Sequence, residues 1–344
     1  MLEIHCSGTP YEIGLQHGRA AAPQISGTIN FYAGLFRDNA KLDWPAVTKT
    51  AMDFEPVIKK KWPAYWEEMQ GVADGADKTL ADIIAINVRT EINFGLFTDG
   101  CTALSWKTSG GKSWLAQNWD WQEAQKPNIV VLHIEQEGKP SIKMVSEAGL
   151  IGKIGLNSKG VGICLNAIRA KGMDITRIPC HLGLRLALES ESKEEAVAKL
   201  EKYDVASACH YLLADAKDGG IGIEWSSVDG KKIEMDTQGR VFHSNHYVKT
   251  HGIKENQILA DSKDRIKRIE ELSNELKEDE LNFDNVFNIF KDEQGLPGAI
   301  CRYEAPPTTT SATLFNIVME LQEKKAMVTM GRPVAPGERV ELAF

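Results

Sequence analysis

Several features that assign a function class at once are missing from this 344-residue sequence. The net charge is −8, with 40 Lys and Arg against 48 Asp and Glu, so there is no basic surplus that would attract nucleic acid. No apolar run approaches the length of a membrane-spanning helix, and we expect no membrane partner. The first residues lack the basic and apolar regions of a signal peptide, and the last three are not a peroxisomal signal of the Ser-Lys-Leu kind. We therefore expect a cytoplasmic protein.

Paired cysteines and phosphate-binding loops are also missing. The six cysteines show no CxxC pair, which suits a reducing compartment better than a disulfide framework. The Gly-Gly pairs at 110–111 and 219–220 are typical of turns rather than of a phosphate loop. His243 and His246 have no cysteine or carboxylate at ligand spacing, so we expect no metal and no bound cofactor.

What is present is a change of hydrophobic period near residue 100. Residues 1–100 show apolar side chains at helical spacing, with Thr79 as the cap of one helix, whereas later segments alternate as strands do. Predicted strands cover 129–134, 142–145, 154–156, 161–165, 209–215, 221–225, 231–235, 313–319 and 326–330, and predicted helices cover 181–188, a segment from a capping box at Ser192, and two stretches within 261–291. This order predicts an α+β fold of two stacked antiparallel sheets with helices outside.

Asp99-Gly100-Cys101 lies at this change of period. Cleavage between Gly100 and Cys101 would give Cys101 a free α-amino group, and one residue would then carry both a nucleophile and a base. Before cleavage, the thiol could attack the Gly100 carbonyl and form an ester-like intermediate that water resolves. By itself, the tripeptide is more often a turn followed by a packed strand cysteine.

Two further segments carry polar groups that suit such a nucleophile. Asp120, between Trp119 and Trp121, could orient the Cys101 amine while the indoles form an apolar wall; an exposed acid between two core tryptophans is the equal alternative. Asn245 could donate its side-chain N–H to a developing oxyanion. A Cys–His dyad with one of the two neighbouring histidines, 243 or 246, is another possibility.

The motifs taken together resemble the isopenicillin-N acyltransferase family (acyl-coenzyme A:6-aminopenicillanate acyltransferase), within the N-terminal-nucleophile cysteine hydrolase superfamily. The resemblance runs along nearly the whole chain, through GTPYEIG at 8–14, DGCT at 99–102, QNWD at 117–120, EAGLIGK at 147–153, HSNH at 243–246 and ATLFNI at 312–317. It implies a four-layer αββα sandwich made as a precursor that cuts itself between Gly100 and Cys101. Residues 1–100 would be the helical pro-segment and 101–344 the catalytic part, together forming one intertwined globular unit.

The resemblance also implies roles for single residues. Cys101 matches the nucleophile, Asp120 the acid that organises it and Asn245 the oxyanion donor. The penicillin-making members carry Ser-Arg-Gly where this chain has Thr309 and the two residues after it, so a cation that could bind a substrate carboxylate is absent there. Thr309, Trp119 and Trp121 remain candidate substrate contacts.

The implied function is transfer of an acyl group through a thioester on Cys101, from a thioester or amide donor to an amine or to water. Acyl-coenzyme A is the candidate co-substrate, and the cleaved 1–100 segment is the expected partner. The alternatives are a pure N-acyl amide hydrolase and a non-catalytic paralogue that acts as a binding protein.

Overall fold

The computed structural model describes residues 1–93 and 100–344 of the chain. The N-terminal part consists of one strand followed mainly by helices: β1 (Leu2–Ser7), α1 (Pro10–Ala20), α2 (Ala22–Leu35), the π-helical η1 (Phe36–Ala40), α3 (Trp44–Met52), α4 (Glu55–Lys61), α5 (Pro63–Ala76), α6 (Leu80–Asn87) and α7 (Arg89–Ile92). Helices dominate this part, as the sequence predicts.

The remaining chain forms two sheets, one of which also includes β1. The eight-stranded sheet has the order β1-β4-β5-β6-β7-β8-β9-β10, and the six-stranded sheet has the order β11-β2-β3-β12-β13-β14. Their strands are β2 (Gly100–Lys107), β3 (Ser113–Trp121), β4 (Ile129–Glu135), β5 (Ile142–Glu147), β6 (Ile154–Asn157), β7 (Val161–Ala167), β8 (Cys209–Asp215), β9 (Gly219–Trp225), β10 (Gly230–Ile233), β11 (Arg240–His243), β12 (Ala312–Glu320), β13 (Lys325–Met330) and β14 (Arg339–Ala343). All predicted strands and both predicted hairpins are confirmed.

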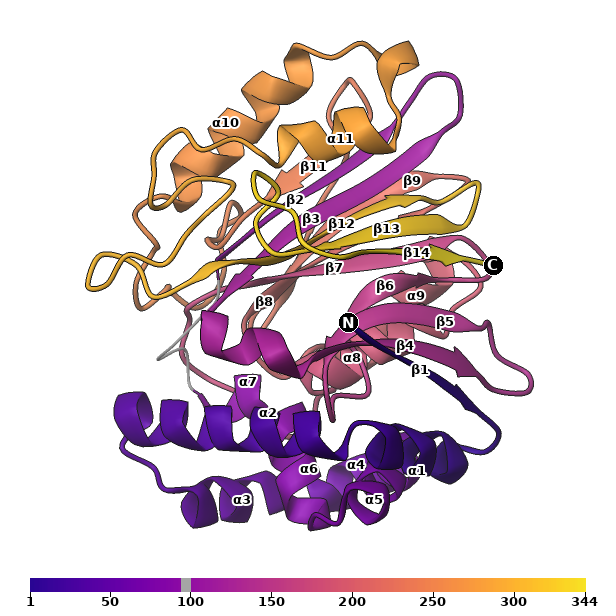
Figure 1. The fold of residues 1–344 in the computed structure, drawn as a ribbon, viewed down its shortest axis with the longest axis vertical. Coiled ribbons are helices and arrows are strands. Elements are labelled where there is room, and N and C mark those ends of the chain that lie inside the picture. The colour runs from indigo at the N-terminus through magenta and orange to yellow at the C-terminus, as the bar shows by residue number, and fades with distance from the viewer. Residues whose placement is uncertain (94–99) are drawn as a thin grey trace.

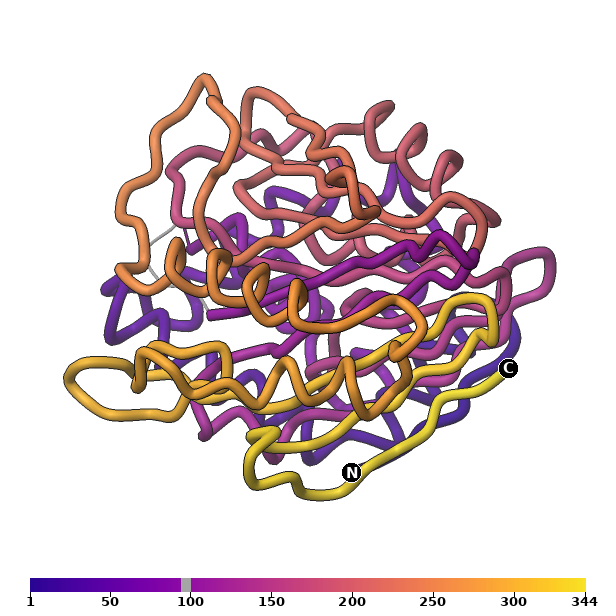
Figure 2. The backbone as a smooth tube through the Cα atoms, turned by 90° about the horizontal axis from the view of Figure 1, so that it is seen from above, coloured from indigo at the N-terminus to yellow at the C-terminus, as the bar shows by residue number. Residues whose placement is uncertain are grey.

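The sheets stack face to face with helices on both outer sides (Figure 1). Helices α8 (Cys180–Leu188) and α9 (Lys193–Tyr203) contact the eight-stranded sheet, and α10 (Ser262–Asn274) and α11 (Phe283–Ile289) contact the six-stranded sheet. Short 3-10 turns, η2 (Glu123–Asn128) and η3 (Glu278–Glu280), complete the elements. The view from above shows α10 and α11 lying over the strands (Figure 2). The predicted αββα layering is therefore present.

Strand β1 was not predicted, because residues 1–100 were expected to be mainly helical. It pairs with β4 in parallel, with Leu2 opposite Val130 and Ser7 opposite Glu135. The N-terminal part thus adds an edge strand to a sheet whose other strands come from residues after 100, and the sheets are antiparallel except for this pair.

Local sequence signals explain several helix starts. Thr9 and Glu12 form a reciprocal capping box at α1, and Thr79 and Asp82 form another at α6, as the predicted Thr79 cap requires. At α9, Ser192 accepts from the backbone N–H of the residue three positions on, but the box is only half formed, because that glutamate side chain accepts from the N–H of residue 191 instead.

Helices α1 and α5 approach each other closely because glycines line their contact. A Cβ atom on Gly14 would lie 1.9 Å from the backbone oxygen of Glu68, and one on Gly71 would lie 2.1 Å from the backbone oxygen of Tyr11. The contact therefore depends on glycine through space rather than through backbone conformation.

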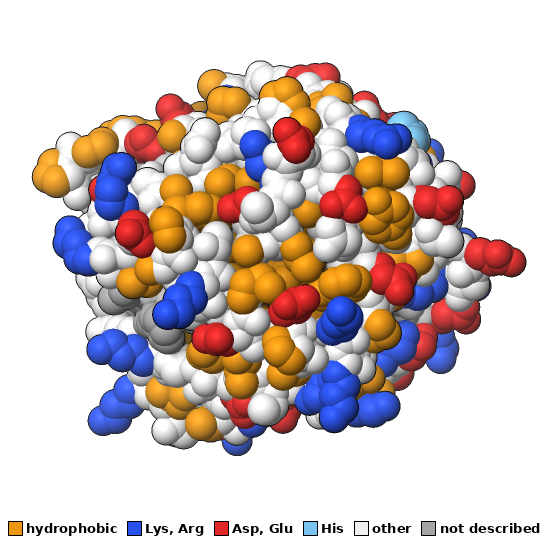
Figure 3. All heavy atoms as spheres, turned by 90° about the horizontal axis from the view of Figure 1, so that it is seen from below, with side chains coloured by type: hydrophobic (Ala, Val, Ile, Leu, Met, Phe, Trp, Pro, Cys, Tyr) orange, Lys and Arg blue, Asp and Glu red, His pale blue; other side chains and the backbone are white. Residues whose placement is uncertain are grey.

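The outer face of the N-terminal helices retains apolar side chains. Figure 3 shows hydrophobic side chains gathered in the middle of this view with charged ones around them. None of the helices in residues 1–93 and 100–344 has both the length and the apolar character needed to cross a bilayer.

Candidate active site

Cys101 is the second residue of β2 and is completely buried. Its backbone N–H donates to Asn245 Oδ1 at 2.8 Å, and its backbone oxygen accepts from Arg265 Nη1 at 2.6 Å. Both backbone polar groups of the candidate nucleophile are thus held by side chains from outside its own strand. Asp99, the residue before the Gly100-Cys101 pair, lies outside the described residues.

The register of β2 against β3 decides which way the side chains of this site point. Cys101 lies opposite Trp119, and Gly100 lies opposite Asp120. Directly opposed residues of an antiparallel pair share a face of the sheet, and successive residues alternate. The Cys101 thiol therefore faces the space between the two sheets, with Trp119, while Asp120 faces the α10 side.

Asp120 lies next to Gly100, the residue before the candidate cleavage point. Its Oδ1 accepts from the Thr313 hydroxyl at 2.7 Å, whereas the buried Oδ2 has no hydrogen-bond partner among the described residues. A Cβ atom on Gly100 would lie 3.0 Å from Asp120 Oδ2 and 2.6 Å from Arg302 Nη1, so a larger residue there would push these side chains aside. The orphaned oxygen is therefore next to the backbone that precedes Cys101.

The electrostatics of Asp120 reflect burial against nearby cations. Burial raises the pKa of Asp120 to about 6, and Arg302 and Arg265 limit the rise. Asp261 joins the two arginines, accepting from Arg265 Nε at 2.7 Å and from Arg302 Nη2. Asp120 is thus mostly ionised at neutral pH.

Asn245 connects the candidate nucleophile to the same arginine. Its Oδ1 accepts from Arg265 Nη2 at 2.8 Å in addition to Cys101 N, and its Nδ2 donates to the backbone oxygen of Ala167 at 3.0 Å. An amide nitrogen carries two hydrogens, so this bond leaves a second N–H to be directed elsewhere. The backbone N–H of Asn245 donates to Ser262 Oγ at the start of α10.

The structure gives the two neighbouring histidines other partners. His243 Nε2 lies 2.8 Å from Glu224 Oε1 and its Nδ1 lies 2.9 Å from the Ser244 backbone oxygen. His246 Nδ1 lies 2.7 Å from Ser262 Oγ. Both rings therefore belong to a hydrogen-bonded network behind Asn245.

The three candidate substrate contacts divide between two places. Trp119 is stacked on Phe315 with ring centres 5.3 Å apart, and Trp121 lines a cavity of about 40 Å³ on the thiol side of the sheet. Thr309 instead lines a pocket of about 460 Å³ beside Arg302, on the Asp120 side. The structure therefore brings Trp119 and Trp121 to the thiol side and leaves Thr309 on the other side.

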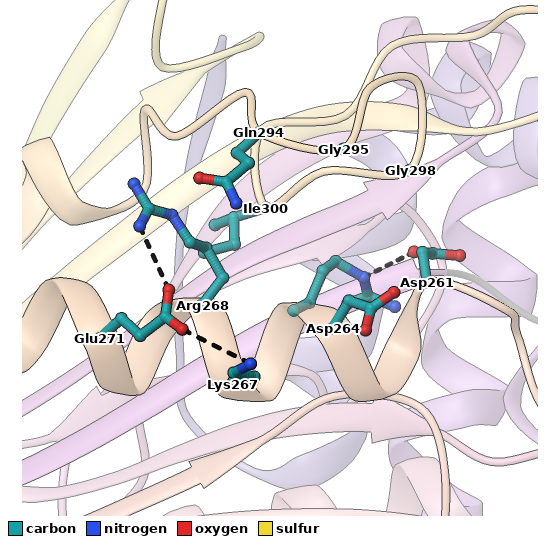
Figure 4. Close-up of a pocket in the computed structure, with 10 residues that line it drawn as sticks. Asp261, Asp264, Lys267, Arg268, Glu271, Gln294, Gly295, Gly298 and Ile300 are labelled. Atoms are coloured by element: carbon teal, nitrogen blue, oxygen red, sulfur yellow. Dashed lines mark hydrogen bonds and ion pairs between the residues drawn. The ribbon is translucent and has the colours of Figure 1, made fainter.

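Arg265 and Arg302 belong to the site but were not singled out as catalytic or binding residues from the sequence. Arg265 comes from an amphipathic, charge-rich helix, in which nothing in the pattern separates one buried arginine from its exposed neighbours. Figure 4 shows the outer side of this helix, where a pocket of about 250 Å³ lies between α10 and residues 294–300 and ends at Asp261. The pairs Arg265–Asp261 and Arg268–Glu271 line it.

Among the described residues, one group of three acids has oxygens close enough together to hold a metal: Glu194, Asp215 and Asp218. They belong to the start of α9 and the end and turn of the β8–β9 hairpin, not to the Cys101 cluster.

Comparison with known proteins identifies the family of this chain. The profile described as acyl-coenzyme A:6-aminopenicillanic acid acyl-transferase matches residues 106–335. A 40 kDa form of acyl-coenzyme A:6-aminopenicillanic-acid-acyltransferase from Emericella nidulans is 38% identical over 352 residues, covering 100% of this chain and 96% of that protein.

Solved structures share the fold at low sequence identity. A variant of conjugated bile acid hydrolase from Clostridium perfringens superposes with a TM-score of 0.52 and 13% identity, covering 71% of this chain and 92% of its own. A second mutant of that hydrolase gives a TM-score of 0.51 with the same identity and coverage. The four-layer arrangement described above is the N-terminal-nucleophile hydrolase fold.

Proposed function

Because this chain belongs to the acyl-coenzyme A:6-aminopenicillanic acid acyl-transferase family, we propose that it is a self-processing cysteine acyltransferase or amidohydrolase. One observation supports this above all. The backbone nitrogen of Cys101 is held by Asn245, and the orphaned Oδ2 of Asp120 faces the residue before it. A buried carboxylate oxygen without a partner is costly, and a new ammonium group at Cys101 would satisfy it.

Self-cleavage would begin with the thiol of Cys101 attacking the carbonyl carbon of Gly100. The C–N bond between the two residues breaks, the thiol proton passes to the departing nitrogen, and a thioester joins Gly100 to the Cys101 sulfur. Water then hydrolyses the thioester. The products are a carboxylate on Gly100, a thiol on Cys101 and a free α-amine on Cys101.

The exposed amine would then act in acyl transfer. The Cys101 sulfur attacks the acyl carbonyl of an amide or thioester, the amine accepts the thiol proton, and that proton passes to the leaving group. An amine or water attacks the resulting thioester and returns the thiol. Asp120 stabilises the protonated amine, and the second Nδ2 hydrogen of Asn245 is directed to the oxyanion.

The relatives suggest the chemical class of the substrates. The Emericella nidulans relative is named for acyl-coenzyme A and 6-aminopenicillanic acid, and we propose a small-molecule acyl donor and an amine acceptor here, with acyl-coenzyme A as one candidate donor. Trp119 and Trp121 are the candidate contacts for the acyl group on the thiol side, and Thr309 is the candidate contact on the other side. A hydrolase, with water as acceptor, is the related second function.

Partition of the acyl group separates these two functions. The protein is acylated with one donor at increasing amine concentration, and amide product is measured against free acid. Amide that rises with amine concentration supports transfer, and free acid alone at high amine concentration supports hydrolysis.

The mass of the purified protein under denaturing conditions tests the proposal. We expect two species of 100 and 244 residues, the second beginning at Cys101, and the 244-residue species should gain the mass of an acyl group when mixed with a thioester donor. Cys101→Ala should give one uncut chain without acylation. Cys301→Ala, at another buried cysteine, is the matched control and should be cut as the natural protein is. Activity in the Cys101→Ala protein would overturn the mechanism, whereas failure of an electrophile to label Cys101 in the natural protein would favour a binding role.

A further inference from the structure

We propose that the small cavity on the thiol side of the six-stranded sheet binds a carboxylate group of the substrate. This inference rests on the proposed function, because it names a chemical feature of the molecule that acylates Cys101. The cavity measures about 40 Å³ and is lined by two cationic side chains, Arg89 and Lys153, together with Tyr32, Trp121, Ala167 and His181 among others. That volume holds about three water molecules, roughly the space of one carboxylate.

The two cations share one acid. Glu147 Oε2 lies 2.5 Å from Arg89 Nη2 and 3.1 Å from Lys153 Nζ, and the carboxylate also accepts from the Tyr32 hydroxyl at 2.5 Å. Although burial opposes it, Arg89 and Lys153 lower the pKa of Glu147 to about 2, so this acid is ionised. Glu147 does not line the cavity; it lies behind the two cations.

The rest of the lining adds no negative charge. No Asp or Glu is among the described residues that line the cavity. His181 lies against Arg89 through Nε2 and bonds the Gly152 backbone oxygen through Nδ1. Burial and the neighbouring cations hold the pKa of His181 well below its ordinary value, so the ring is neutral. The cavity wall is therefore positive.

Glu91 is a second buried acid and lies in the same helix as Arg89. It accepts from the backbone N–H of Cys180 at 2.8 Å and from the Ser207 hydroxyl at 2.7 Å, which fixes it at the first turn of α8. Burial raises its pKa, which lowers its tendency to supply a negative charge. It does not line the cavity.

Lys153 is the side chain best placed to bind the carboxylate. It is only 1% exposed, and its bond to Glu147 uses one of its three N–H groups. A buried ammonium that shares Glu147 with an arginine gains most from a second anion. The methylene stem and the charge lie over Trp119, with Nζ 4.4 Å from the ring centre.

Two series of side-chain contacts link the cavity to the candidate nucleophile, Cys101. Trp119, beneath Lys153, is the cross-strand neighbour of Cys101 and shares its face of the sheet. Ala167, in the cavity wall, accepts from Asn245, which in turn holds the backbone nitrogen of Cys101. We infer that a substrate whose carbonyl is at the thiol places its carboxylate in this cavity, against the sides of Arg89 and Lys153 that Glu147 does not occupy.

The carboxylate could belong to the acyl part or to the amine part, and matched substrates separate the two. In the first pair, the acyl chain ends in a carboxylate or a carboxamide, as in glutaryl anilide and its terminal amide. In the second pair, one acyl group is joined to glycine or to glycinamide. With the self-cleaved protein, we expect kcat/KM to favour the carboxylate about tenfold or more in one pair.

Variants of Lys153 assign that preference to the cavity. Lys153→Met should bring the ratio of kcat/KM values close to one, and Lys153→Arg should retain a clear preference for the carboxylate. Lys171→Met, which removes an exposed lysine, should leave the ratio unchanged. If Lys153→Met fails to fold, Lys153→Gln, which removes the charge but keeps a hydrogen-bond donor, should bring the ratio close to one in its place.

Equal kcat/KM values within both pairs would overturn the carboxylate site while leaving the proposed function standing, because Cys101 would still be acylated. A preference that survives in Lys153→Met would also overturn it. No acylation by any of the four substrates or by a simple thioester would contradict the proposed function, and the carboxylate site with it.

Discussion

At the scale of single residues, the site is defined by which oxygen and nitrogen atoms have partners. Asp120 has one oxygen bound by Thr313 and the other directed at Gly100 without a hydrogen bond. Asn245 uses its oxygen for Cys101 and Arg265. The uncut chain therefore already contains an acceptor for the charge that cleavage would create, and it carries the energetic cost of that acceptor.

This cost predicts a pH dependence of stability. The pKa of Asp120 is about 6 in the folded chain, whereas it is about 3.9 for an unfolded aspartate. Since the folded value is raised, ionisation destabilises the fold; the cost is absent below the unfolded pKa and complete above the folded one. The difference corresponds to about 3 kcal/mol.

The cost of ionising Asp120 is measured by urea unfolding of the uncut Cys101→Ala protein, with and without the additional substitution Asp120→Asn. We expect the asparagine variant to gain about 3 kcal/mol relative to its parent between pH 4 and pH 7. Asp77→Asn, at an exposed aspartate, should show no such trend. A constant difference between the first two proteins across this range would contradict the assigned ionisation.

The sequence could point to Cys101, Asp120 and Asn245 because each lies in a motif whose residue types suit one chemical step. It could not point to Lys153 or Arg265. Lys153 follows an apolar stretch and resembles any strand-flanking lysine. Its contact with Glu147 becomes meaningful only once Arg89, at the start of α7, also contacts that acid. Burial and partnership across the fold, rather than residue type, distinguish such residues.

At the scale of elements, close contact between α1 and α5 fixes how the N-terminal helices pack. Gly14→Ala would place a methyl group 1.9 Å from the backbone oxygen of Glu68, and the backbone cannot move aside as a side chain could. We expect a loss of about 3 kcal/mol in the free energy of unfolding, measured by urea titration.

Gly34→Ala in α2 is the matched control, because nothing lies within 4 Å of its added Cβ. Relief of glycine's flexibility in the unfolded chain should stabilise this variant by about 0.5 kcal/mol or more. If both alanine variants unfold at the same urea concentration, the α1–α5 contact is not as tight as described.

Element prediction succeeded where the pattern was local and long. The predicted hairpins consist of apolar runs on either side of clear turn residues, and the start of α9 is marked by its Ser192 cap. Strands β1, β11 and β14 were not predicted, since each is short and lies at a sheet edge, and β2 and β3 were expected around Cys101 and Asp120 without bounds. In β1, the partner is more than 100 residues away in the chain, so no local pattern could reveal the pairing.

At the scale of the whole molecule, the N-terminal part and the remaining chain share one core. Ile4 and Ile25 belong to the same apolar cluster as Val131 and Leu156, and β1 completes a sheet begun by later strands. Cutting before Cys101 would break one covalent bond and leave these contacts in place.

We therefore predict that the two pieces of the cut protein elute together in size-exclusion chromatography and separate only in denaturant. Gel electrophoresis of the eluted peak should show both pieces in equal molar amounts. Elution of the 244-residue piece alone in native buffer would mean that the shared core does not hold the pieces together.

The pairing of β1 with β4 affects how the protein can refold before and after cleavage. While the chain is whole, refolding is unimolecular, because the connecting chain keeps β1 close to its partner. Once the chain is cut, the same sheet can be regained only by collision of two separate molecules, at a rate that depends on their concentration. A cut molecule that unfolds at low concentration is therefore lost, so its working lifetime is set by how slowly it opens rather than by how readily it folds.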